Sequence, residues 1–361
     1  MSKRKSNLQI AQEQAESTIK KTNNKIEELG KSTYNLYTSL NDIQELFDKI
    51  RNIPSEKRLE YNKLKNVRLI WKQQVEKIEA DYKNAVAKNA GKGVVGVGAG
   101  VAVVALGPTA AMGVATTFGV ASTGTAISTL SGAAATKAAL AWLGGGTLAT
   151  GGGGIVAGNA LLALAGPIGW AIAGVALLGS GLLFWKTKSN QDRLEDIFTL
   201  ISNRDINSYE LAIVEINERI SHIIDESVIL HNAIEKIESF GLDYNQMTEA
   251  QQYELAAYVN LMSASTQLLV NPILGLQPKY NEEDFGKFTS DGNSKSINKD
   301  LIIALSNLLY KIKLDNEDKK LLWKSFKRNK KFLTSLNTSK KELDYVILDI
   351  VCEALDFKYK L

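Results

Sequence analysis

Residues 144–170 read GGGTLATGGGGIVAGNALLALAGPIGW, and this run lies inside a 93-residue segment, Gly93–Trp185, whose only ionisable side chain is Lys137. The segment holds 22 of the chain's 28 glycines, and no acid occurs between Asp81 and Asp192. Ordinary soluble domains are about a quarter charged. A segment of this length with one charge therefore predicts contact with lipid, or with protein on nearly every side.

The length of the segment is sufficient for several membrane-spanning helices. A bilayer core about 30 Å thick needs roughly 20 apolar residues per span, so the segment accommodates about four spans, or two hairpins. Gly107-Pro108 and Gly166-Pro167 divide it, because proline lacks the amide donor that a helix needs. Lysines flank both ends of the segment, which predicts that both ends lie on the cytoplasmic side of the membrane.

Small residues recur every four positions within the segment, as in Gly96 and Gly100 or Gly154 and Gly158. Such spacing lets helix backbones approach closely in lipid. Lys137 would cost about 2.5–3.5 kcal/mol at the bilayer centre, so it is expected to face a lumen, a partner or the interface. The residues predicted to insert into the membrane or to pack the inserted helices are Gly96, Gly100, Gly154, Gly158, Gly169, Gly174, Trp170, Trp185 and Lys137.

The ends of the chain and its overall composition set further bounds. The 361 residues allow two or three structural units, and the formal charge of +4 is too small for a general polyanion binder. A single cysteine, Cys352, excludes an internal disulfide framework and is expected to be a small buried residue. No apolar run follows the N-terminus, so we expect synthesis in the cytoplasm without a signal peptide, and association with the inner membrane either constitutively or after a trigger.

The N-terminal arm, residues 1–92, is predicted to be a helical hairpin. Apolar residues follow a heptad pattern through 8–53, and Pro54 separates this helix from a second one over 55–90. Gly30 is expected to bend the first helix. The seam favours either the core of a helical bundle or an oligomerising coiled coil, and either arrangement allows homo- or hetero-oligomers through the arms. The predicted seam residues of the first helix are Leu8, Ala15, Ile19, Ile26, Leu29, Leu36, Leu40, Ile43, Phe47 and Ile50, with Gln12, Thr22 and Thr33 in polar positions.

The second half of the chain is also predicted to be helical. A second arm, 186–270, carries an isoleucine-rich seam that ends at Gly241, and Thr248 with Gln251 indicates a capping box. A linker over 271–297 and a small helical C-terminal unit, 298–361, with helices over 298–313, 315–334 and 339–356, follow. The basic run Lys319–Lys331 is typical either of a solvated helix face or of a surface for anionic lipid, nucleic acid or an acidic partner.

The sequence offers no constellation for catalysis. His222 and His231 lie nine residues apart on one predicted helix, which is not the spacing of a metal site. The GxGxxG match at Gly91–Gly96 lacks a preceding strand. We therefore expect neither an enzyme nor a cofactor, and no small-molecule substrate is evident.

The layout, all-α with amphipathic arms around a Gly/Ala-rich hydrophobic hairpin segment, resembles α-helical pore-forming toxins, colicin pore domains and apolipoprotein-L-like proteins. The runs at 144–154 and 164–170 look like the glycine-zipper segments of bacterial proteins found in toxin and phage-defence settings. The resemblance implies a membrane-permeabilising bacterial effector, and it assigns no site residues.

Three functions remain open at this point. The first is a pore-forming or membrane-disrupting effector that acts on the lipid bilayer when triggered. The second is a constitutive integral membrane scaffold or subunit, partnering a cytosolic protein such as a dynamin-like GTPase. The third is a soluble bundle whose apolar segment is its core. The third is disfavoured, because a core needs large side chains to fill its volume and this segment has few.

Overall fold

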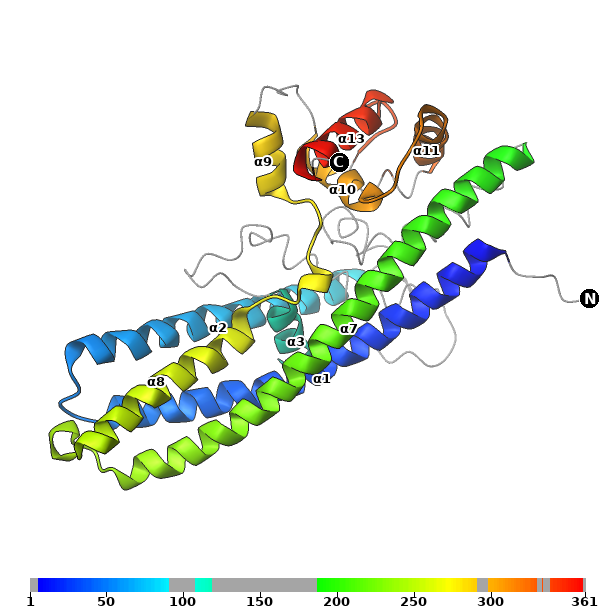
Figure 1. Ribbon diagram of the computed structural model, residues 1–361. Helices are drawn as coiled ribbons and strands as arrows, with labels where there is room; N and C mark the ends of the chain where they lie inside the picture. The colour runs from blue at the N-terminus through cyan, green and yellow to red at the C-terminus, as the bar shows by residue number, and fades with distance from the viewer. Residues whose placement is uncertain are drawn as a thin grey trace, which may run out of the picture.

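The computed structural model describes residues 6–90, 108–118, 187–290, 298–329, 333 and 338–359. Within these residues the fold is all-α, as predicted, and no strand occurs in them. Four long helices run side by side as an elongated bundle, and shorter helices form a separate unit beside one end of it (Figure 1). The long helices are α1 (Asn7–Lys49), α2 (Ser55–Ala90), α7 (Lys188–Ser239) and α8 (Glu249–Val270).

The helix ends follow the signals in the sequence. Pro54 precedes α2, and its carbonyl accepts the amide of Arg58 at 3.0 Å. The helix α7 ends before Gly241, whose φ of +83° is the left-handed conformation that favours glycine. The helix α8 begins with the predicted capping box, in which Thr248 and Gln251 bond each other's backbone amides.

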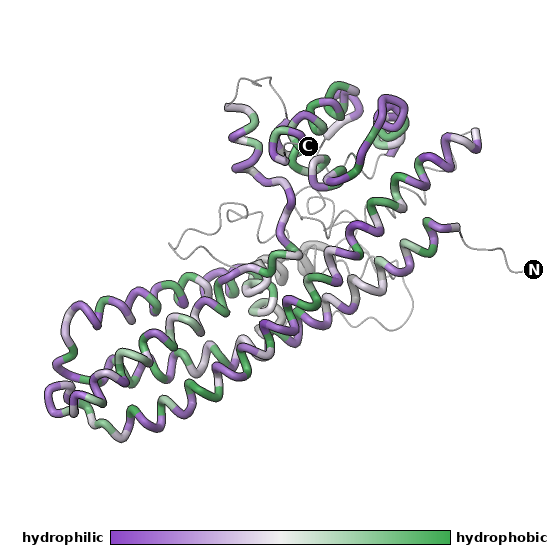
Figure 2. Tube along the Cα trace, in the orientation of Figure 1, coloured by the Kyte–Doolittle hydropathy of each residue, from purple (hydrophilic) through white to green (hydrophobic). Residues whose placement is uncertain are grey.

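The predicted seam of α1 is confirmed wherever its side chains are described. Leu8, Ala15 and every predicted apolar position from Ile26 to Ile50 are at most 3% exposed, and so are Thr22 and Thr33. The helix continues through Gly30 to Lys49, so the expected bend does not interrupt it. Figure 2 shows hydrophobic and hydrophilic residues alternating along each of these helices, which is the pattern of a bundle with one buried face per helix.

The two predicted arms lie together in this one bundle. The helix α1 packs most extensively against α7, whereas α2 packs mainly against α8, so α1 and α2 touch each other only sparingly. A short helix, α3 (Pro108–Phe118), lies among α1, α2 and α8. Their shared core is the arrangement that the bundle alternative predicted, since each seam is buried by helices of the same chain.

The C-terminal unit has its own hydrophobic core. It consists of α9 (Glu282–Ser290), α10 (Lys299–Leu309), α11 (Asn316–Arg328) and α13 (Val346–Tyr359). The first turns of the bundle join this core, because Leu8 of α1 and Leu194 and Phe198 of α7 are buried in it.

The segment predicted as a linker, 271–297, is partly helical. It contains a short turn, η4 (Leu274–Leu276), as well as α9, because Leu276 is buried in the bundle core and Phe288 in the C-terminal core.

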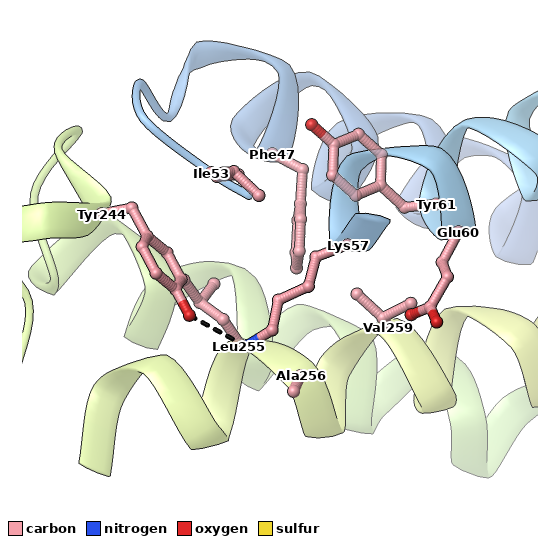
Figure 3. Close-up of a pocket in the computed structure, with 9 residues that line it drawn as sticks. All are labelled: Phe47, Ile53, Lys57, Glu60, Tyr61, Tyr244, Leu255, Ala256 and Val259. Carbon is pink, nitrogen blue, oxygen red and sulfur yellow. Dashed lines mark hydrogen bonds between the residues drawn. The ribbon is translucent and has the colours of Figure 1, made fainter. Parts of the chain in front are cut away.

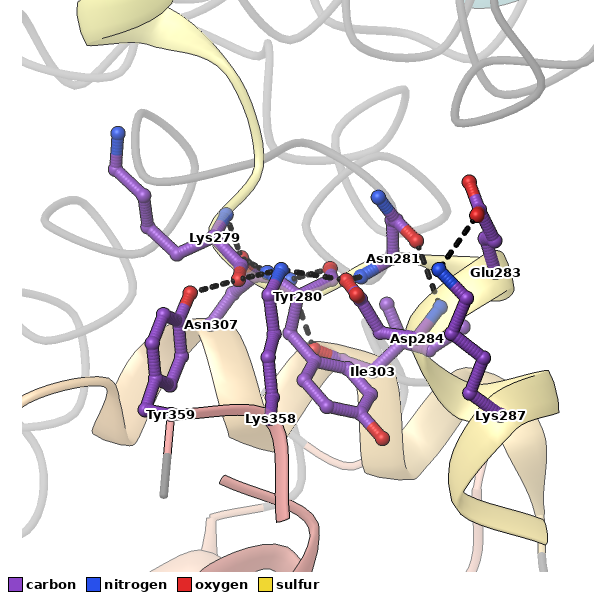
Figure 4. Close-up of polar contacts among 10 residues, drawn as sticks. All are labelled: Lys279, Tyr280, Asn281, Glu283, Asp284, Lys287, Ile303, Asn307, Lys358 and Tyr359. Carbon is purple, nitrogen blue, oxygen red and sulfur yellow. Dashed lines mark hydrogen bonds and ion pairs between the residues drawn. The ribbon is translucent and has the colours of Figure 1, made fainter. Parts of the chain in front are cut away.

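A cluster of hydrogen bonds and an ion pair holds this segment against the C-terminal unit (Figure 4). The Asn307 side chain accepts the amides of Lys279 and Tyr280 at 2.7 and 3.0 Å, and its amide group donates to the carbonyls of Tyr280 and Ile303. Lys358 Nζ donates to the Lys279 carbonyl at 2.7 Å and pairs with Asp284 at 2.6 Å. All four hydrogen-bonding positions of the Asn307 amide group are therefore used, which fixes the chain between the two cores.

Among the described residues, no helix combines the length and apolarity that crossing a bilayer requires. The predicted membrane hairpins are therefore not supported by this part of the chain. Most of the apolar segment lies outside the described residues, and so do all nine of its predicted insertion and packing residues: Gly96, Gly100, Gly154, Gly158, Gly169, Gly174, Trp170, Trp185 and Lys137.

Candidate functional site: an apolar helix inside the bundle

The helix α3 is the part of the apolar segment that the structure describes. Its side chains from Ala111 to Thr117 are buried, with Met112 and Val114 at 1% exposure, and they belong to the same core as the bundle seams. Helices α1, α2 and α8 all contact it. This stretch of the segment therefore faces protein in the described structure.

Two glycines bring α3 and α1 into backbone contact. A methyl group built on Gly30 of α1 would lie 1.8 Å from the carbonyl oxygen of Thr109, and one built on Gly113 of α3 would lie 2.1 Å from the carbonyl oxygen of Ile26. Real side-chain carbons do not come so close to backbone atoms, so even alanine would force the helices apart at either position. The crossing of α1 and α3 thus depends on the absence of a side chain on both helices.

The C-terminal end of α3 is held by the chain that follows α8. The amide of Ile273 donates to the Thr117 carbonyl at 2.8 Å, and Gln277 Nε2 donates to the same oxygen at 3.3 Å. The hydroxyl of Thr117 donates back to the Gly113 carbonyl at 2.7 Å. The last carbonyls of a helix lack partners within the helix, and here one of them is satisfied by a segment 156 residues further along the chain.

A buried arginine lies among α1, α2 and α8. Arg68 is 2% exposed, and it donates to Gln44 Oε1 at 2.7 Å and to Thr266 Oγ1 at 3.3 Å, both of which are neutral groups. Its Nε has no acceptor in the described part of the chain. Burial lowers the pKa of Arg68 to about 10, because the guanidinium is removed from water.

The carboxylate that offsets the charge of Arg68 reaches it through one intervening side chain. Gln44 Nε2 donates to Asp48 at 3.0 Å, and Asp48 pairs with Lys65 at 2.7 Å. Asp48 therefore stabilises the guanidinium through the amide group of Gln44 and not through a direct ion pair. A buried charge with this partial compensation weakens the closed bundle relative to an apolar core of the same shape.

A small pocket lies at the end of the bundle where α1 is followed by α2 (Figure 3). Its volume is about 50 Å³, and Lys57 closes one side of it by donating to the Tyr244 hydroxyl at 2.8 Å. Pockets for drug-sized ligands typically measure 300–1,000 Å³. This pocket is therefore too small to hold a cofactor or a metabolite of ordinary size.

The residues considered for chemistry are not assembled into a site. His222 and His231 are both exposed on α7, and among the described residues no cluster of potential metal ligands occurs. Cys352 is half-buried rather than fully buried, and burial raises the pKa of its thiol above its ordinary value. A raised pKa reduces the thiolate fraction and therefore the reactivity of a cysteine.

Comparison with known protein families, with curated proteins and with solved structures gives no match.

The contact between Gly30 and Gly113 was not predicted, although the sequence contains a signal for it. Gly30 is the only glycine in the first 90 residues, and it follows the seam residue Leu29. Glycine inside a helix costs about 1 kcal/mol relative to alanine, so a lone glycine beside a buried seam indicates close approach of another backbone. Its partner could not be singled out, because the apolar segment offers 22 glycines.

Proposed function

We propose that the protein is a membrane-disrupting effector that keeps part of its apolar segment inside the helical bundle until it is released. The observation that carries this proposal is the contact between Gly30, which lies outside the apolar segment, and Gly113, which lies inside it. We call the site on α1, α2 and α8 that holds α3 the seat. Its shape fits one glycine-bearing apolar helix. In this function the lipid bilayer is the target, and the glycine-rich remainder of Gly93–Trp185 is the inserting unit.

Storage in the bundle and insertion into lipid place opposite demands on such a helix. An 11-residue helix is about 16 Å long, which is half of a bilayer core, so α3 would have to join neighbouring apolar residues to cross a membrane. In water its apolar side chains are stabilised by burial in the bundle. Small residues serve both states, because they allow close backbone packing against α1 and against other helices in lipid.

The release step is supported by the partial compensation of Arg68. Arg68 lies in the same bundle as α3, and without a direct counterion it makes the bundle less stable than one with a fully apolar core, so the bundle can release α3 at lower cost. The proposal therefore assigns the bundle the role of a store, and it assigns the apolar segment the role of the active element. A constitutive membrane scaffold would not require α3 to leave its seat.

The test is dye release from liposomes by the Gly30→Ala variant. Its added methyl group displaces α3, while the sequence of the apolar segment is unchanged, so any gain in leakage comes from release and not from hydrophobicity. We expect the initial rate of leakage to rise at least about tenfold, since the loss of 1.4 kcal/mol from the seat changes an equilibrium tenfold. Circular dichroism would verify that the variant remains helical.

Gly286→Ala is the matched control, because a methyl group at this helical position in α9 meets nothing within 4 Å. It should leave leakage at the wild-type rate. Equal leakage from wild type and Gly30→Ala, with α3 accessible to protease only in the variant, would refute the proposed function.

A further inference from the structure

The outer face of α11 carries a row of lysines. Leu321, Leu322 and Phe326 face the C-terminal core and are at most 4% exposed. Lys320, Lys324 and Lys327 follow one another at intervals of four and three residues, which places them on one face of the helix, opposite Leu322; Lys320 is exposed, and Lys324 and Lys327 are half-buried. Lys320 and Lys324 form no ion pair with the described residues, and Lys327 lies over the Trp323 ring at 4.6 Å.

The acidic residues at the start of α11 pair with α7. Asp315, Glu317 and Asp318 at its N-terminal end all bond the guanidinium of Arg193 on α7, with distances of 2.9 Å to Glu317 and 2.5 Å to Asp318. Lys319 pairs with Asp349 of α13 at 2.8 Å. From Lys320 to Arg328 the helix has no acidic residue, so the charged residues of this part of α11 are all basic.

This arrangement has a cost within the isolated protein. Lysines at positions i and i+4 repel each other and destabilise a helix by a few tenths of a kcal/mol per pair. Trp323 is half-buried, and its Nε1 donates to the Leu343 carbonyl at 3.0 Å, so the indole is fixed beside the basic row. An anionic surface would relieve the repulsion and would meet the exposed edge of an aromatic residue favoured at membrane interfaces.

We propose that the outer face of α11 docks on an anionic lipid surface and holds the start of α7 close to it. The inference rests on the proposed function in one respect, namely that a bilayer is the target. Arg193 fixes α11 to α7 at a point only eight residues beyond Trp185, the end of the apolar segment. The N-terminal end of α11 thus lies beside the start of α7, the first described helix after the apolar segment.

The residue types favour lipid over nucleic acid. Nucleic-acid recognition favours arginine, whose planar fork binds phosphate in two hydrogen bonds, whereas lysine is a compact point charge. The row of three lysines spans about 10 Å along the helix, which is short for tracking a nucleic-acid backbone. A lipid headgroup layer requires only that several cations face one plane.

The test is co-sedimentation of the full chain with phosphatidylcholine vesicles that contain or lack phosphatidylglycerol. The variant is the triple substitution Lys320→Gln, Lys324→Gln and Lys327→Gln, which keeps helix propensity. Each lysine near an anionic surface contributes a factor of about five, so binding to the anionic vesicles should fall about a hundredfold. Wild-type binding should also weaken with added salt, because salt screens these charges.

The matched control replaces Lys21, Lys63 and Lys77, which are exposed on α1 and α2, with glutamine, so both triple variants have the same net charge. Equal loss of binding in the two triple variants would overturn the proposal, because only net charge would then matter. Tighter binding of a short DNA duplex than of the anionic vesicles, lost in the α11 variant, would overturn it in favour of nucleic acid.

The two proposals fail in different ways. If the α11 variant loses vesicle binding while Gly30→Ala causes no leakage, the docking face stands and the proposed function falls. If Gly30→Ala permeabilises vesicles while the α11 variant binds anionic vesicles like wild type, the proposed function stands and the docking face falls.

Discussion

The bundle and the C-terminal unit each bury a strongly polar side chain, and they treat it differently. Asn307 in the C-terminal unit makes four hydrogen bonds, so its amide group is completely satisfied. Arg68 in the bundle is buried as deeply, but it bonds only neutral groups and its Nε has no partner in the described structure. Fully satisfied buried networks rigidify a core, whereas partly satisfied ones weaken it. Arg68 is therefore a source of weakness in the bundle core that Asn307 does not introduce in the C-terminal unit.

The packing of the two regions differs in the same sense. The C-terminal core is built from large side chains such as Leu305, Leu322 and Phe326, which interdigitate. In the bundle, α3 is seated against α1 through a pair of glycines, where the two backbones meet directly. Contact between backbones buries little apolar side-chain area, so it adds less hydrophobic stabilisation than the packing of large side chains. The contact between α1 and α3 therefore selects a helix of particular shape but contributes only modestly to stability.

The largest expected effect concerns the support of Arg68. Gln44→Leu should destabilise the bundle by about 3–5 kcal/mol, because it leaves the buried guanidinium without its shortest hydrogen bond and without the relay from Asp48. The double variant Gln44→Leu with Arg68→Met should instead be about 1–4 kcal/mol more stable than wild type, since an apolar pair replaces a buried charge. Urea unfolding followed by circular dichroism measures both values.

These two variants sharpen the comparison because they are expected to change the free energy of unfolding of the bundle in opposite directions. If the double variant is as unstable as Gln44→Leu alone, the guanidinium is not the source of the weakness. The bundle would then be no less firmly closed than the C-terminal unit.

A somewhat smaller effect is expected where the two regions meet. Asp205 of α7 is fully buried and pairs with Arg204 at 2.6 Å, and Arg204 also donates to the Leu308 and Tyr310 carbonyls at the end of α10. Burial raises the pKa of Asp205 from its ordinary value near 3.8 to about 6, against the opposing effect of Arg204. The folded protein therefore takes up this proton at a higher pH than the unfolded chain does.

The consequence is a stability that increases on acidification. Between about pH 6 and pH 4 the folded state binds more protons at Asp205 than the unfolded state, so the free energy of unfolding rises as the pH falls. Asp205→Asn does not titrate. The difference in unfolding free energy, wild type minus Asp205→Asn, should therefore rise by about 2 kcal/mol from pH 7 to pH 4. A difference that is constant with pH would contradict the raised pKa.

Much of the fold could be predicted from sequence periodicity. The α1 seam, the end of α7 at Gly241 and the capping box at Thr248 follow local rules, because a helix seam and a cap depend on residues close in sequence. The helix α9 was missed because its short polar sequence resembles a loop. It is helical because Phe288 is buried in a core made by distant residues.

The candidate site was less predictable for the same physical reason. The glycine contacts predicted from the sequence lie within the apolar segment, at positions outside the described residues. The contact that the structure describes joins Gly30 and Gly113 across 83 residues, and no local pattern specifies which of many glycines meets the lone glycine of α1. The relay from Asp48 through Gln44 to Arg68 likewise requires knowledge of how α1 and α2 are placed.

Hydrogen exchange of the α3 amides in wild type and in Gly30→Ala tests the central claim most directly, namely that the crossing of Gly30 and Gly113 keeps α3 in the bundle. In buffer we expect the amides of residues 111–118 to be protected in wild type, and to lose that protection in Gly30→Ala while α10 and α11 keep theirs, because isolated helices of this length are unstable in water. Gly286→Ala should match wild type. Equal protection of α3 in wild type and in Gly30→Ala would contradict the account.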